Sequence, residues 1–174
     1  MKYSVKFFVV TFFLLVCTYS FAEQKIVVLD MKHVLNFSKA GKGAQDYLKE
    51  SFTNNRKKFA DIEQNLKKEE IDLLEKKTIL SKEEYTKKTD TLRKKVIDYQ
   101  SQRRGALDKI ATQRVEARET LLQKVTPILD SYMKENNISI VIDAKNTLGG
   151  NPDVDITKII VEKLNKELPS LNLK

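Results

Sequence analysis

Thr78-Ile79-Leu80-Ser81-Lys82-Glu83-Glu84 interrupts a long charged helical pattern, and this interruption decides the fold. Ser81 stands three residues before Glu84, which is the spacing of a capping box that begins a helix. Proline is absent from Gly43 to Thr126, so the chain favours helix on both sides of the interruption. We therefore predict two helices with a turn near residues 79–81, folded into an antiparallel hairpin rather than continued as one helix.

Apolar residues recur along both predicted helices with the three-and-four spacing of a coiled-coil seam. Asn55 and Glu69 interrupt the first seam, and Arg103 and Gln113 interrupt the second. Polar seam positions weaken packing, so we expect this arm to bend and splay. The apolar seam residues are Leu48, Phe52, Phe59, Ile62, Leu66 and Leu73 in the first helix, and Tyr85, Leu92, Val96, Tyr99, Ala106, Ile110, Ala117 and Leu121 in the second.

Two segments rich in Ile and Val flank the arm and predict a small sheet. Lys25–Asp30 is apolar on both faces, as a central or interface strand would be. The two-residue period of a strand places Ile138, Ile140 and Ile142 on one face. We expect about three strands and two short helices in this base. So few strands are marginally stable in water, which predicts pairing between subunits.

Glycine and proline predict the limits of the arm. We expect Gly41-Lys42-Gly43 to form a turn before it, and Pro127 to kink or end the second helix near Thr126. The predicted arm is therefore 41–126, and residues 23–40 and 127–174 form the base. Within the base, Asn136 and Asn137 are expected to end a helical stretch, and Asp153 or Asp155 to cap the last helix.

The first residues have the three-part layout of a secretory signal peptide, residues 1–22. Met1–Lys6 is positive, Phe7–Val16 is largely apolar, and Ser20-Phe21-Ala22 offers small residues before the predicted cleavage. The apolar stretch is shorter than the roughly 20 residues of a membrane-spanning helix. Cleavage also removes Cys17, the only cysteine, so the mature chain has no disulfide. A retained anchor and lipidation at Cys17 remain as alternatives.

The charge of the chain narrows the class of partner. The formal net charge is +8, and the stretch from Arg56 to Arg104 holds 15 Lys and Arg against 10 Asp and Glu. An exported basic protein is expected to meet anionic lipid, lipopolysaccharide or acidic unfolded chains rather than nucleic acid. The alternative is a solvated helix face stabilised by pairs such as Asp72 and Lys76. The candidate contact residues are Lys67, Lys68, Lys76, Lys77, Lys87, Lys88, Arg93, Lys94 and Lys95.

Residues suited to catalysis or metal binding are sparse. His33 is the only histidine, so a metal site with several histidine ligands cannot form. With one histidine in this position we also predict no Ser-His-Asp triad. Asp30 and Asp143 end apolar strands, where aspartate is commonly a turn residue. We therefore predict no catalytic residue, no metal and no cofactor.

The order of these parts resembles the Skp/OmpH family of periplasmic chaperones. The resemblance rests on Lys25–Asp30, the charged hairpin, Ile140–Asp143 and Val154–Thr157 in that sequence, and it covers Gln24 to Leu168. It implies an α+β fold, predominantly α, in which a long helical hairpin projects from a small β body completed by trimerisation. It also implies a Gram-negative periplasmic location and ATP-independent binding of unfolded outer-membrane proteins between the arms.

This resemblance gives the candidate sites their roles. The predicted trimer interface is Ile26, Val28, Ile140 and Ile142. The predicted client-binding residues are Phe52, Phe59, Ile62, Leu66, Tyr85, Leu92 and Tyr99, and the alternative is that these pack the hairpin itself.

Two other classes of protein share parts of this pattern. A membrane-anchored coiled-coil stalk also has an apolar N-terminus and a long charged helix, but it needs neither a cleavage site nor the two terminal strands. A histone-like nucleic-acid binder shares only the charge and lacks a base-reading module.

Overall fold

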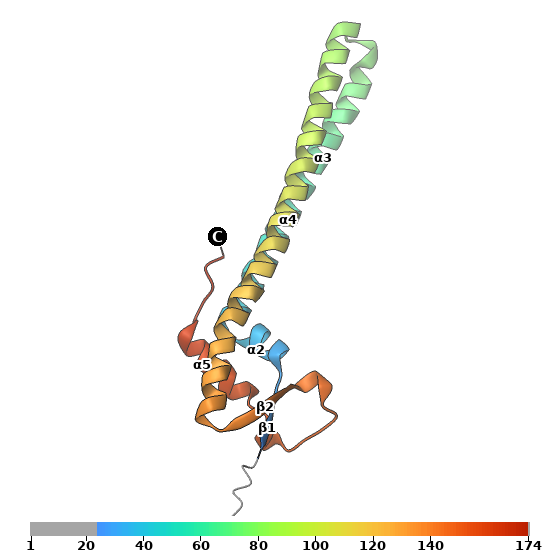
Figure 1. The fold of residues 1–174 in the computed structure, drawn as a ribbon. Helices are drawn as coiled ribbons and strands as arrows, with labels where there is room; N and C mark the ends of the chain where they lie inside the picture. Colours follow the sequence, from blue (N-terminus) through green and yellow to red (C-terminus); the bar gives the residue numbers. More distant parts are fainter. Residues whose placement is uncertain (1–23, 174) are drawn as a thin grey trace, which may run out of the picture.

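A computed structural model describes residues 24–173. The predicted signal peptide, its cleavage site and Cys17 lie outside these residues. Two long helices dominate the structure, α3 (Lys39–Glu75) and α4 (Lys82–Glu135), and they run antiparallel as one projecting arm (Figure 1). The predicted hairpin is therefore confirmed.

The turn at the tip of the arm has the predicted capping box. A short 3-10 helix, Lys76–Thr78, follows α3, and Ser81 caps α4. The Glu84 backbone N–H donates to the Ser81 hydroxyl at 3.3 Å, and the Ser81 hydroxyl and backbone N–H donate to the Glu84 carboxylate at 2.8 and 3.2 Å. The bond from the hydroxyl, followed by that from the backbone, lowers the pKa of Glu84. The carboxylate therefore stays ionised beside the positive N-terminus of the helix.

The base is a small parallel sheet covered by helices. Strand β1 (Lys25–Leu29) pairs in parallel with β2 (Ile138–Asp143), and helices α2 (Met31–Phe37) and α5 (Thr157–Glu167) complete the base. The described residues contain two strands rather than three. Val28 makes only an isolated bridge to Asp155, in the segment that leads into α5.

The register of the sheet corrects the predicted face of Ile138. Lys25 pairs with Ile138, but Ile26 pairs with Ile140, so Ser139 is an extra residue in β2. Such a bulge reverses the alternation of side chains. Ile138 is consequently buried in the core, whereas Ile140 is exposed on the opposite face.

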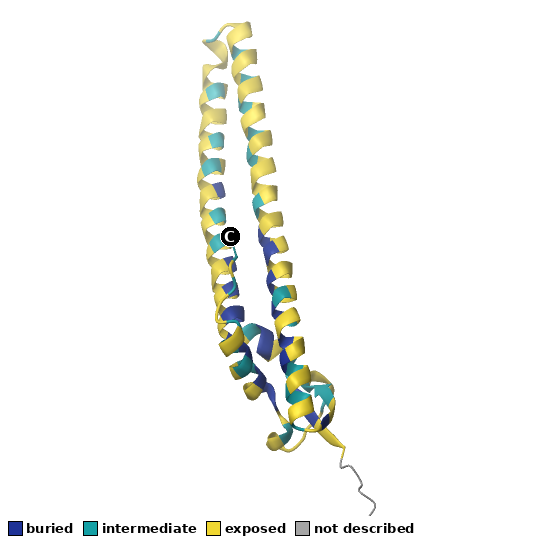
Figure 2. Ribbon diagram, turned by 60° about the vertical axis from the view of Figure 1, so that its left-hand side comes forward, coloured by how far each residue is buried: buried dark blue, intermediate teal, exposed yellow. Residues whose placement is uncertain are grey.

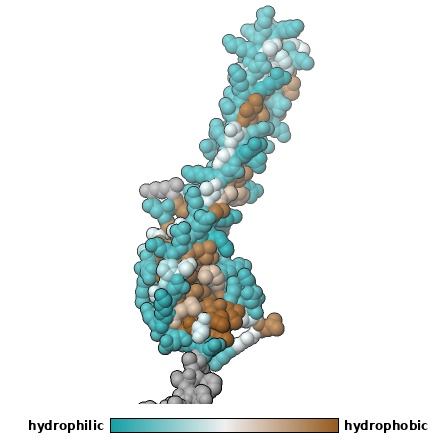
Figure 3. Space-filling view, in the orientation of Figure 1, coloured by the Kyte–Doolittle hydropathy of each residue, from teal (hydrophilic) through white to brown (hydrophobic). Residues whose placement is uncertain are grey.

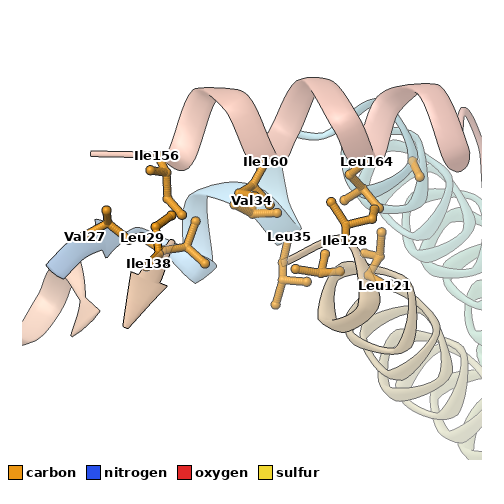
Figure 4. Close-up of a cluster of buried hydrophobic side chains, with 12 residues drawn as sticks. Val27, Leu29, Val34, Leu35, Leu121, Ile128, Ile138, Ile156, Ile160 and Leu164 are labelled. Atoms are coloured by element: carbon orange, nitrogen blue, oxygen red, sulfur yellow. The ribbon is translucent and has the colours of Figure 1, made fainter. Parts of the chain in front are cut away.

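The hydrophobic core lies where the arm helices enter the base. Figure 4 shows side chains of α2, α4, α5 and both strands meeting in one cluster. Ala40, in the first turn of α3, also belongs to this cluster. Its buried members are Val27, Leu29, Val34, Leu35, Ala40, Leu121, Val125, Ile128, Ile138, Ile156, Ile160 and Leu164.

Of the two predicted effects of Pro127, a kink or an end of the helix, the second does not occur, because α4 continues to Glu135. A proline inside a helix costs about 3 kcal/mol. Val125 and Ile128 lie on either side of it and are buried in the core, and each buried side chain contributes roughly 1.5–3 kcal/mol. Core packing therefore outweighs the local penalty.

Gly41 and Gly43 also lie inside a helix, not in a turn, because α3 begins at Lys39. The break between α2 and α3 falls instead at Ser38, which is buried and whose hydroxyl accepts the Gly41 backbone N–H at 3.2 Å. As predicted, α4 ends at Asn136, its C-cap, and Asn137 follows with a φ of 52°. The N-cap of α5 is Ile156 rather than Asp153 or Asp155, although Asp155 accepts the Thr157 backbone N–H at 2.8 Å.

One polar interruption of the seam is buried without compensation. Gln113, in α4, is buried, and its Nε2 has no hydrogen-bond partner among residues 24–173. A buried unpaired polar group costs about 1–3 kcal/mol. We expect Gln113→Met to raise the free energy of unfolding by about 1 kcal/mol. Urea unfolding followed by circular dichroism measures this, with the exposed Gln123→Met as the control that should change little. A loss of stability in Gln113→Met would mean that the amide makes a stabilising contact in solution.

Candidate functional site

The seam of the arm is tightly packed only near the base. Figure 2 shows buried residues between the lower halves of α3 and α4, whereas the outer half is mostly exposed. Of the predicted client-binding residues, Phe59 is buried, and its ring meets that of Tyr99 edge-on at 6.0 Å. Phe52 is 47% exposed. The remaining five, all half-buried, are Ile62, Leu66, Tyr85, Leu92 and Tyr99.

Three of the predicted client-binding residues meet in a groove of about 420 Å³ between the two helices. Phe52, Phe59 and Tyr99 form part of its apolar surface, together with Leu107. We call this the arm groove. Its lining residues are Phe52, Asn55, Arg56, Phe59, Ala60, Glu63, Tyr99, Arg103 and Leu107. Ile62, Leu66, Tyr85 and Leu92 do not line it.

A hydrogen bond joins two residues that line the arm groove, one from each helix. The Tyr99 hydroxyl donates to the Glu63 carboxylate at 3.1 Å. Desolvation first, and then this hydrogen bond, raises the pKa of Tyr99. Tyr99 therefore remains a neutral donor, and one oxygen of Glu63 is already occupied.

Arg56, Arg103 and Leu107 were not singled out from the sequence as contact residues. A coiled-coil seam is recognised from its apolar positions, so Arg103 counts in the sequence only as an interruption of the seam. The available signal was helical spacing, since Tyr99, Arg103 and Leu107 follow one another at steps of four on one face of α4. Only the pairing of α3 with α4 then brings Phe52 and Arg56 opposite them.

The predicted electrostatic contact residues are all exposed on the outer part of the arm. Two of them are engaged within the arm. Lys95 pairs with Glu69 across the helices at 2.6 Å, and Arg93 pairs with Asp90 at 3.3 Å. The others have no ion-pair partner among the residues that the structure describes, and they are Lys67, Lys68, Lys76, Lys77, Lys87, Lys88 and Lys94.

The four residues of the predicted trimer interface share the outer face of the sheet. Ile26 pairs with Ile140, and Val28 pairs with Ile142. Ile26 and Ile140 are 45% and 47% exposed, and no helix of the described chain covers them. Figure 3 shows apolar residues gathered on the base, whereas the arm is mostly hydrophilic with smaller apolar patches. Leu148, in the loop after β2, is also fully exposed, and sequence analysis did not identify it.

The acidic residues at the strand ends, Asp30 and Asp143, accept hydrogen bonds from nearby backbone N–H groups. Asp30 accepts the His33 backbone N–H at 2.7 Å and so caps α2. Asp143 accepts the Lys145 backbone N–H, and this bond, followed by the Lys145 ammonium, lowers the pKa of Asp143. His33 is exposed and stacks on Phe37 at 4.5 Å. Both acids therefore act as turn and cap residues.

Residues 24–173 offer no group of three or more His, Cys, Asp or Glu side chains able to hold a metal ion. Across the same residues, no helix combines the length and the apolar character that crossing a membrane requires.

The family model described as outer membrane protein (OmpH-like) matches residues 25–164, which include both strands and the whole arm. The chain belongs to the OmpH-like family. A crystal structure of a candidate outer membrane chaperone (OmpH-like) from Caulobacter crescentus has a TM-score of 0.78 at 18% identity, covering 86% of this chain and 88% of that one. No curated protein sequence matches at a significant level. The OmpH-like fold and the resemblance seen in the sequence are thus confirmed.

Proposed function

We propose that this OmpH-like chain is an ATP-independent holdase chaperone of the periplasm, which binds unfolded outer-membrane proteins between the arms of a homotrimer. The observation that carries the proposal is the family match across both the sheet and the arm. The similar Caulobacter crescentus protein is itself described as a candidate outer membrane chaperone. The proposal involves no catalytic residue, metal or nucleotide.

The uncovered face of the sheet supports the trimer. Ile26, Val28, Ile140 and Ile142 present an apolar surface on a sheet of two strands. A sheet of that size is marginally stable alone, and its exposed edges invite pairing. Three copies that bury these faces together would form one β body and place three arms around a common space.

The composition of the arm supports weak binding of varied clients. Apolar side chains such as Phe52, Ile97 and Leu107 are exposed on the arm, which also carries many lysines. Each contact is weak, but contacts from several arms add through multivalency. The basic surface attracts acidic segments over a Debye length of about 8 Å at physiological salt. Release then needs no energy source, because a client that folds elsewhere no longer offers its unfolded contacts.

The test is light scattering of the exported protein, alone and with a urea-unfolded outer-membrane barrel diluted into it. We expect the mass of a trimer, and suppression of barrel aggregation at low stoichiometry without nucleotide. A monomer or dimer that lets the barrel aggregate would overturn the proposal. That outcome would favour the alternative, a membrane-anchored coiled-coil stalk.

We also propose contact between the arm tips and anionic lipid or lipopolysaccharide. At the tip, Ile79 is 81% exposed, with Lys76 and Lys77 before it and Lys82 after it. An exposed apolar side chain among lysines suits an anionic interface. Flotation with phosphatidylglycerol vesicles should recover the protein, and vesicles of phosphatidylcholine should not. Equal recovery with both would contradict a role for the lysines.

A further inference from the structure

The arm groove has the size and the surface of a binding site for one side chain and its neighbours. Its volume of about 420 Å³ falls within the roughly 300–1,000 Å³ of small ligand pockets. Phe52 and Leu107 are partly exposed in it, at 47% and 43%. Phe59 is held in place behind them by its edge-on contact with Tyr99. The apolar surface is therefore accessible, and its aromatic base is fixed.

The charged residues of the arm groove favour a carboxylate. Neither Arg56 nor Arg103 has an ion-pair partner among residues 24–173. Glu63 is the only acidic residue in the lining, and its carboxylate accepts the Tyr99 hydroxyl. Two guanidinium groups thus border an apolar surface with their charge available. The planar guanidinium of arginine binds a carboxylate through two parallel hydrogen bonds. A lysine ammonium acts as a point charge and recognises a carboxylate less specifically.

We propose that the arm groove binds a segment of unfolded polypeptide in which an aromatic or large aliphatic side chain stands close to an Asp or Glu. In an extended segment, residues two apart point to the same side. A Phe-x-Asp unit therefore presents the ring to the apolar surface and the carboxylate to Arg56 or Arg103. This proposal rests on the proposed function and names the chemistry that one site in the arm selects.

The groove exists only while the hairpin is closed, because α3 and α4 each supply part of it. Phe52, Arg56 and Glu63 come from α3, whereas Tyr99, Arg103 and Leu107 come from α4. Opening of the seam at this level would separate the two arginines and expose Phe59. A client segment bound in the groove should therefore also hold the two helices together.

The test uses a short fluorescent peptide of glycine and serine that carries one Phe-Ser-Asp unit. Fluorescence anisotropy measures its binding to the wild-type protein, compared with peptides that carry Phe-Ser-Asn or Ser-Ser-Asp. We expect the Phe-Ser-Asp peptide to bind best and each altered peptide to bind several-fold more weakly. Equal binding of the three peptides would overturn the proposal.

Two adjacent arginines provide matched variants. Arg103 lines the arm groove, whereas Arg104 is exposed and does not line it. Both substitutions, Arg103→Glu and Arg104→Glu, change the net charge equally. We expect Arg103→Glu to weaken binding of the Phe-Ser-Asp peptide about fivefold, and Arg104→Glu to have less than about half that effect. Circular dichroism confirms that both variants keep their helices.

The outcomes separate this site from the proposed function. If both variants weaken binding equally, general attraction to a basic arm explains the binding and the groove proposal is wrong. If the wild-type protein suppresses barrel aggregation but does not distinguish the three peptides, the holdase function stands without this site. If the wild-type protein neither suppresses barrel aggregation nor distinguishes the three peptides, the proposed function and the groove proposal are both wrong.

Discussion

Ile140→Asp is expected to convert the proposed trimer to a monomer. Ile140 lies on the outer face of the sheet, paired with Ile26, and no part of the described chain covers it. In the proposed trimer this face is buried. An unpaired carboxylate in an apolar interface costs several kcal/mol, and every subunit would carry one. We therefore expect association to weaken by about a thousandfold or more.

Size-exclusion chromatography with light scattering measures this result directly. The control is Ile97→Asp, because Ile97 is also an exposed isoleucine but lies on the arm. The control should keep the wild-type mass. Since Ile140 is not in the core cluster, circular dichroism should show that the Ile140→Asp monomer keeps its arm helices. A trimeric Ile140→Asp variant would mean that subunits associate through another surface.

The hairpin was predictable because its signals are local. Ser81 and Glu84 are three residues apart, and the capping box needs no other part of the chain. The apolar spacing along each helix likewise depends only on neighbours in the sequence. These signals predicted two helices and the position of the turn.

The structure differs from the sequence-based predictions where packing overrides a local rule. Pro127 disfavours helix, but burial of Val125 and Ile128 keeps α4 continuous. The bulge at Ser139 changes the face of Ile138, and a two-residue period cannot reveal an inserted residue.

The arm groove could not be predicted for a further reason, because it depends on which residues of α3 face α4. Its residues span about a third of the chain, from Phe52 to Leu107. The sequence shows the helical spacing of each half but not the register between them. Phe52, Phe59 and Tyr99 were identified as aromatic seam residues, whereas the arginines beside them required the structure.

The same substitution at two neighbouring glycines is expected to have opposite effects on stability. Gly41 lies in the first turn of α3, directly against the end of α2. A Cβ at residue 41 would lie 1.8 Å from the Leu35 carbonyl oxygen and 3.0 Å from the Ser38 hydroxyl oxygen. Backbone atoms would have to move, and both Leu35 and Ser38 are buried. Gly41→Ala should therefore lower the free energy of unfolding by about 3 kcal/mol.

Gly43→Ala should instead stabilise the protein. A Cβ at residue 43 meets nothing within 4 Å, and the residue is exposed within α3. Alanine is favoured over glycine in a helix by about 1 kcal/mol, because glycine loses more backbone entropy on folding. Urea unfolding at one fixed protein concentration measures both variants, since association contributes to stability. If both substitutions stabilise the protein, α3 does not pack closely against the end of α2. If both destabilise it, the first turns of α3 need glycine for a reason other than this contact.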